Sequence, residues 1–121
     1  MLKVPFSKPD IKKNDLALVT RSIKSGWLAH GKYSNQLENE FVNFTKAKYS
    51  TTVSNCTSGI HTVCMALGLN NKHEVIVPAQ THVATAHAAA MTGAKIKFAD
   101  VDKLTGNILF SEIKKLSQDE K

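Results

Sequence analysis

Residues 53–85 read VSNCTSGIHTVCMALGLNNKHEVIVPAQTHVAT, and this stretch decides the fold class of the 121-residue chain. A small, polar turn opens a helix predicted over residues 57–69, which carries apolar side chains along one face. The segment 74–77 is wholly apolar after its first residue, as in strands that are buried in a parallel sheet. A second polar segment containing His82 leads into an alanine-rich helix predicted at 85–91. Helix and strand therefore alternate, which favours an α/β fold.

The alternation extends to both sides of this stretch. A short, β-branched segment at 49–54 predicts a strand, and residues 95–99 alternate between charged and apolar side chains, which predicts another. Residues 110–116 predict a last helix. The order strand, helix, strand, helix, strand, helix indicates an α/β layer with a mostly parallel sheet. Because this order stops after a helix, we expect the domain to be incomplete.

Two further helices are predicted upstream, at 10–25 and 34–46, from apolar residues that recur at helical spacing. The loop 26–31, which reads GWLAHG, separates them and contains the only tryptophan of the chain. We therefore expect two regions. Residues 1–45 form a helical segment with this loop, and residues 46–121 form the incomplete α/β domain.

The charge and cysteine content restrict the function classes. The formal net charge is +6, but the lysines are scattered, which favours a solvated surface over a nucleic-acid patch. Anionic small ligands, such as a nucleotide-linked substrate, also fit this charge. Cys56 and Cys64 would lie about 12 Å apart along one helix, too far for a disulfide. We expect a cytoplasmic protein with no metal site and no membrane span.

The start of the helix at 57–69 carries residues that can bind a phosphate. Free backbone N–H groups and the helix dipole favour an anion there, and Thr57 and Ser58 add hydroxyl groups. Gly59 allows close approach of the backbone. Taken alone, the same residues also fit a simple helix cap made by Asn55 or Thr57, which is the commoner arrangement.

His82 follows the strand at 74–77 at its carboxyl end, where open α/β sheets bind their ligands. Its imidazole ring can stack on an aromatic ligand or act as an acid or base, and it can equally be a hydrogen-bonded structural histidine. We interpret His61 and His87, which lie within the two predicted helices, as structural or supporting residues.

Seven motifs occur in a characteristic order. They are GW at 26–27, NCTSGIH at 55–61, EVIVP at 74–78, THVATA at 81–86, GA at 93–94, FADVD at 98–102 and TGNI at 105–108. This succession resembles the N-terminal part of the DegT/DnrJ/EryC1/StrS family of pyridoxal-phosphate-dependent sugar aminotransferases, which have the fold-type-I, aspartate aminotransferase-like architecture. The resemblance covers nearly the whole chain.

The resemblance implies a fold and a set of site residues. The fold would be a partial three-layer α/β large domain with a mostly parallel sheet. Thr57 and Ser58 match the residues that hold the phosphate of pyridoxal 5'-phosphate, and His82 matches the position, often Phe or Trp, whose ring stacks on the pyridine. Trp27 and Gly31 match the loop near the sugar-nucleotide substrate. None of these residues is catalytic.

The resemblance also implies an activity and its partners. Family members transfer an amino group, usually from glutamate, to a nucleotide-linked keto sugar, and they are typically homodimers. The lysine that binds the cofactor and the acid on its pyridine nitrogen lie downstream of the motifs matched here, so we expect the chain by itself to be inactive. One alternative is a sugar dehydratase of the same family, in which a histidine replaces that lysine. Another is a small, non-enzymatic module that binds nucleotides or nucleic acid.

Overall fold

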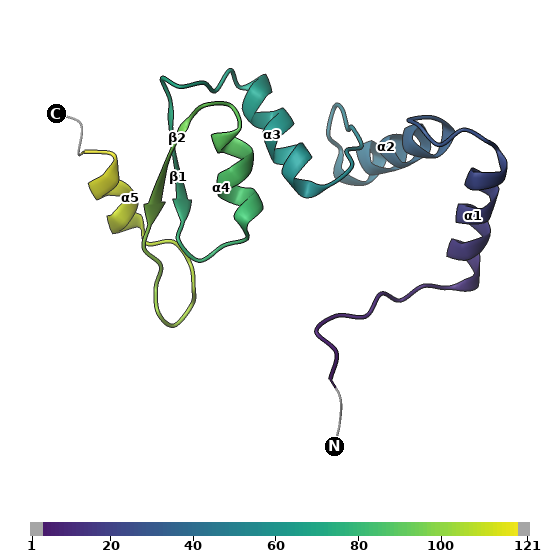
Figure 1. Cartoon of the computed structure of the whole chain (residues 1–121), viewed down its shortest axis with the longest axis horizontal. Helices are drawn as coiled ribbons and strands as arrows, with labels where there is room; N and C mark the ends of the chain where they lie inside the picture. The colour runs from purple at the N-terminus through teal and green to yellow at the C-terminus, as the bar shows by residue number, and fades with distance from the viewer. Residues whose placement is uncertain (1–3, 119–121) are drawn as a thin grey trace. The chain divides into compact units, whose positions relative to one another are not determined.

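The computed structural model describes residues 4–118 (Figure 1). They form two compact units, of which the first ends at Thr52 and the second begins at Val53. The first unit contains α1 (Lys13–Lys24) and α2 (Lys32–Thr45). The domain boundary expected after residue 45 stays a prediction.

The second unit contains the α/β elements, and its secondary structure follows the predicted order from 57 onward. Its elements are α3 (Cys56–Ala66), β1 (Glu74–Pro78), α4 (Val83–Ala90), β2 (Lys95–Ala99) and α5 (Phe110–Leu116). The two strands pair in parallel, with Glu74 opposite Lys95 and Pro78 opposite Ala99. The alternating pattern of apolar strands and intervening helix therefore produces the parallel pairing that the sequence predicts.

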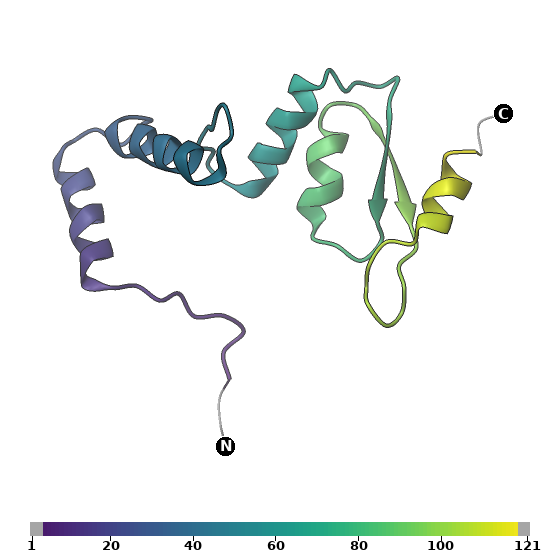
Figure 2. The ribbon, with the colours of Figure 1, turned by 180° about the vertical axis from the view of Figure 1, so that it is seen from behind.

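The core of the second unit is built from small side chains. α4 runs alongside both strands and packs on α3, while α5 lies beside β2 (Figures 1 and 2). The buried apolar residues are Cys64, Val77, Ala84, Ala88, Ala89, Ala94 and Ala99. Three of these alanines lie on α4, and their lack of bulk lets the helix approach α3 and the sheet closely.

The strand predicted at 49–54 does not form, and this prediction is wrong. In the described part of the chain the sheet has two strands, β1 and β2, and they pair with each other. The backbone N–H of Thr52 donates instead to the carboxylate of Glu38, at 2.7 Å. A β-branched segment becomes a strand only where a neighbouring strand accepts its hydrogen bonds, and here a side chain takes that place.

Candidate functional site

The first turn of α3 is capped by a side chain and still offers free donors. Asn55 is the N-cap, and its Oδ1 accepts the backbone N–H of Ser58 at 2.9 Å. The N–H of Gly59 makes the first intrahelical bond, to the Asn55 carbonyl at 3.1 Å. Among the described residues this leaves the N–H groups of Cys56 and Thr57 as open donors at the positive end of the helix. Capping and anion binding are therefore compatible here.

An open hollow of about 400 Å³ adjoins this turn, and it brings α3 and α4 side chains together. It is lined by Asn55, Thr57, Ser58, His61, Thr62, His87 and Met91. The hollow therefore unites both predicted phosphate-binding residues with two histidines. Four of the lining residues belong to α3: Thr57, Ser58, His61 and Thr62. Their spacing places them on one face of the helix, and this spacing is the sequence signal that could have identified the hollow.

His61 links α3 to α4, as expected of a structural residue. Its Nδ1 donates to the backbone carbonyl of Ala88 at 2.9 Å, because a carbonyl can only accept. The hydroxyl of Thr62 donates to the Ser58 carbonyl at 2.8 Å and is therefore already engaged. His87 is exposed and lines the same hollow. These contacts fix the walls around Thr57.

His82 is the N-cap of α4 and follows β1 at its carboxyl end. Its Nδ1 accepts the N–H of Ala84 at 3.1 Å, so the ring is held as a cap while it remains exposed to solvent. The residues around the 400 Å³ hollow do not include it. The structural role left open by the sequence is thus present, and stacking on a ligand ring stays a prediction.

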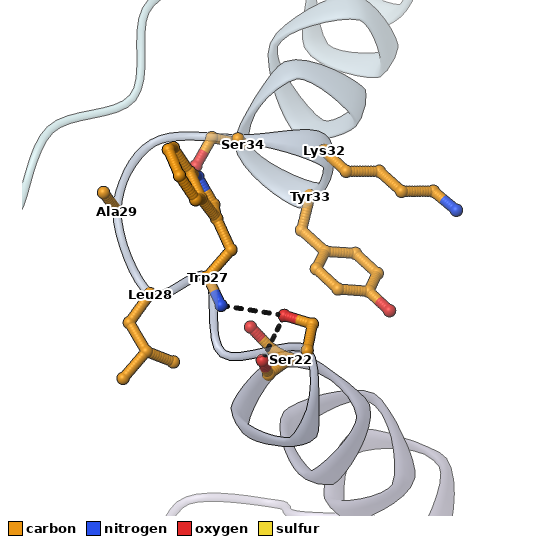
Figure 3. Close-up of a pocket in the computed structure, with 9 residues that line it drawn as sticks. Ser22, Trp27, Leu28, Ala29, Lys32, Tyr33 and Ser34 are labelled. Carbon is orange, nitrogen blue, oxygen red and sulfur yellow. Dashed lines mark hydrogen bonds between the residues drawn. The ribbon is translucent and has the colours of Figure 1, made fainter.

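A second hollow, of about 510 Å³, lies in the first unit at the loop between α1 and α2 (Figure 3). It is lined by Ser22, Ser25, Trp27, Leu28, Ala29, Gly31, Lys32, Tyr33 and Ser34. Both predicted substrate-loop residues, Trp27 and Gly31, are among them. The backbone N–H of Trp27 donates to the Ser25 hydroxyl at 3.2 Å, one of the two contacts drawn in Figure 3.

The indole ring of Trp27 has a fixed place in this loop. Its Nε1 donates to the backbone carbonyl of His30 at 3.0 Å. A Cβ atom at Gly31 would lie 2.7 Å from both Cδ1 and Nε1 of the indole, closer than real contacts allow. The absence of a side chain at position 31 therefore leaves room for the Cδ1–Nε1 edge of the indole.

Gly31→Ala is expected to push the indole out of this place and to break its bond to His30, at a cost of about 1 kcal/mol in the stability of the first unit. The emission of the single tryptophan measures the displacement. Gly26→Ala is the control, because Gly26 has φ +72° and open space around it. That substitution strains the backbone by a similar amount but leaves the indole alone. Equal emission changes in both variants would contradict the contact.

Glu38 joins three donors that the sequence gives no reason to connect. Its Oε1 accepts from His30 Nε2 at 3.0 Å and from the backbone N–H and hydroxyl of Thr52, at 2.7 and 2.9 Å. These hydrogen bonds lower the pKa of Glu38 to about 2, and the bond from His30 has the largest effect. The partners lie eight residues before and fourteen residues after Glu38, so no local periodicity indicates them.

The low pKa of Glu38 makes the first unit sensitive to acid. Because the pKa is lower in the folded chain than its usual value of 4.5, the stabilisation is complete above about pH 4.5 and is lost as the pH falls toward 2. An NMR titration of the Glu38 carboxyl carbon measures this. Thr52→Val removes one of the three donors and should raise that pKa. An ordinary titration of Glu38 near pH 4.5 in the unchanged chain would contradict the cluster.

Other features of the described residues restrict the chemistry. No helix in residues 4–118 is both long and apolar enough to cross a membrane. Within the same range no group of three or more His, Cys, Asp or Glu side chains could hold a metal ion. Cys56 is exposed, Cys64 is buried, and both are free thiols.

The fold and the first site together define an α/β protein in which the N-terminus of α3, next to α4, suits a phosphorylated ligand. The chain belongs to the DegT/DnrJ/EryC1/StrS aminotransferase family, whose model matches residues 9–119. The family resemblance stated from the ordered motifs is confirmed.

A curated relative supports this assignment. GDP-perosamine synthase of Vibrio cholerae is 34% identical over 113 residues, which cover 93% of this chain and 31% of the relative. The chain thus spans about a third of the length of this relative.

Solved structures share the fold. A protein of Streptococcus pneumoniae described as a sugar aminotransferase, in its PLP form, aligns with a TM-score of 0.86 and 24% identity over 94% of this chain and 29% of that one. Escherichia coli GDP-4-keto-6-deoxy-D-mannose-3-dehydratase with bound hydrated PLP aligns with a TM-score of 0.82 and 25% identity, over 98% and 32% of the two chains. The predicted partial α/β fold of the family is confirmed.

Proposed function

We propose that this chain supplies part of the cofactor and substrate site of a pyridoxal 5'-phosphate-dependent aminotransferase that acts on nucleotide-linked keto sugars. The observation that carries the proposal is the first turn of α3, where Thr57 and Ser58 line a hollow beside open N–H donors within the NCTSGIH motif of the family. The name of the Vibrio cholerae relative, GDP-perosamine synthase, implies a nucleotide-linked amino sugar as product.

The residues around α3 fit the cofactor phosphate. The N–H groups of Cys56 and Thr57 and the hydroxyls of Thr57 and Ser58 would hold the phosphate at the positive end of the helix. The imidazole of His82, held in place by its bond to Ala84, would lie against the pyridine ring. The bound cofactor carries the amino group and withdraws electrons from the substrate carbon.

The hollow at Trp27 and Gly31 would form part of the wall for the nucleotide sugar. Its mixed lining of aromatic, hydroxyl and lysine side chains suits a ligand with a planar base and a charged diphosphate. We further propose glutamate as the amino donor, a homodimer as the working form and the cytoplasm as its location, as the family resemblance implies.

A dehydratase of the same family is the second candidate, because the solved structures that share this fold include GDP-4-keto-6-deoxymannose-3-dehydratase with a trapped PLP-glutamate adduct. We prefer the aminotransferase because the relative with 34% identity is named a GDP-perosamine synthase. Product analysis distinguishes the two, since amino transfer adds nitrogen to the sugar and dehydration removes an oxygen. The non-enzymatic module gains no support from the family assignment.

The experiment titrates the 121-residue chain with pyridoxine 5'-phosphate, which keeps the ring and the phosphate but has no aldehyde to react with surface lysines. We expect saturable binding at one site that inorganic phosphate competes away. In a parallel assay with pyridoxal 5'-phosphate, glutamate and a GDP-linked keto sugar, we expect no amino transfer by this chain. Absence of binding would refute the phosphate site, and turnover would refute the proposed inactivity.

A further inference from the structure

The Trp27 indole is connected to Glu38 by a continuous chain of contacts. Glu38 holds the imidazole of His30 at 3.0 Å, and the backbone carbonyl of the same His30 accepts Nε1–H of the indole at 3.0 Å. Glu38 belongs to α2, whereas Trp27 and His30 belong to the loop before it. The carboxylate therefore anchors the loop to a helix at the residue that orients the indole.

The side chain of Glu38 is less exposed to solvent than His30 and Trp27. The side chain of Glu38 is 17% exposed, compared with 54% for His30, while Trp27 as a whole is 65% exposed. A hydrogen bond between exposed groups is weak by itself, because water competes for both partners. A half-buried carboxylate that already accepts two bonds from Thr52 is less mobile, so its bond to His30 restricts the loop more than an exposed contact does.

We propose that Glu38 is a positioning residue which, through His30, holds the Trp27 indole in place at the wall of the 510 Å³ hollow, where it would receive the base of a nucleoside diphosphate. The ligand class rests on the proposed function, whereas the positioning itself rests on the contacts alone. Glu38 does not line the hollow, so its effect on a ligand is indirect.

The chain offers matched controls that separate positioning from a merely structural role. Thr52→Val removes a hydroxyl that donates to the same oxygen, Oε1 of Glu38, but leaves the backbone N–H of Thr52 and the bond to His30 in place. Glu40→Gln changes a carboxylate on the same helix that accepts from Gln36 and does not contact the loop. Glu38→Leu removes the acceptor oxygen itself, whereas Glu38→Gln would keep one. If Glu38 only stabilised the first unit, Thr52→Val would loosen the indole as much as Glu38→Leu does.

The readout is the time-resolved anisotropy of the single tryptophan in the 121-residue chain, because a released side chain rotates on the picosecond to nanosecond scale. We expect Glu38→Leu and His30→Ala each to raise the ratio of mobile to fixed indole about fivefold, the factor that corresponds to one ordinary hydrogen bond. The double variant should show no more than either single change. Thr52→Val should loosen the indole less than Glu38→Leu, and Glu40→Gln should match the unchanged chain. A fixed indole in Glu38→Leu overturns the proposal.

A titration with GDP separates this proposal from the proposed function. Weaker GDP binding in Glu38→Leu, together with a mobile indole, supports both. If the indole loosens but the unchanged chain binds no GDP, the positioning by Glu38 stands and the substrate wall is refuted. If the unchanged chain binds GDP and Glu38→Leu binds it equally well despite a mobile indole, the positioned indole does not serve the ligand and that part of the proposal is overturned.

Discussion

Ala88→Leu is expected to destabilise the second unit by about 1–3 kcal/mol, because the new side chain has no space to enter. Ala88 is 0% exposed and lies on α4, which contacts α3 and both strands. Its carbonyl also accepts the bond from His61, so the helix cannot move away without breaking the link between α3 and α4. Three added carbon atoms must therefore separate α4 from its neighbours.

The buried thiol of Cys64 measures this effect. It is 8% exposed on α3, so a thiol reagent reaches it when the unit opens, whereas the exposed Cys56 reacts at once. We expect Ala88→Leu to accelerate labelling of Cys64 roughly 5- to 140-fold, the rate ratio that matches the expected loss of stability. Ala90→Leu is the control, because Ala90 is exposed on the same helix and both residues favour helix. Equal labelling rates in the two variants would contradict the packing of Ala88.

The sequence predicts the elements of the second unit that local patterns determine. The apolar run at β1, the alternation at β2 and the alanine-rich α4 each appear where expected, since each pattern is complete within a few residues. The segment 49–54 shows the opposite case. Its β-branched residues satisfy the local rule, but a strand also needs a partner, and Thr52 bonds to the side chain of Glu38 instead.

The candidate sites likewise contain some residues that local sequence predicts and others that it does not. Thr57 and Ser58 follow from a cap and a helix start that are contiguous in sequence, and the sequence also indicates Asn55 as a cap, which the structure contains. The contacts around Glu38 could not be predicted, because they join residues separated by eight and fourteen positions. The clash that requires Gly31 likewise depends on where the indole of Trp27 lies in space, which the loop sequence does not specify.

Thr57→Val is expected to weaken the binding of pyridoxine 5'-phosphate roughly 10- to 140-fold, because a hydrogen bond to a charged group contributes more than a neutral one. Valine keeps the shape of threonine and removes only the hydroxyl, so the hollow beside α3 stays the same size. Thr62→Val is the matched control. Its hydroxyl lines the same hollow but already donates to the Ser58 carbonyl, so its loss should change the affinity little.

Comparing two ligands assigns the two halves of the proposed site. Pyridoxine without phosphate should bind Thr57→Val as well as it binds the unchanged chain, because the missing hydroxyl contacts only the phosphate. His82→Asn should weaken both ligands roughly 2- to 12-fold through loss of the stacked ring. Asparagine is chosen because it is a good N-cap and can replace the bond of His82 to Ala84, so α4 stays capped. If His82→Asn leaves both affinities unchanged, His82 is a cap and nothing more, and the pyridine ring is held elsewhere.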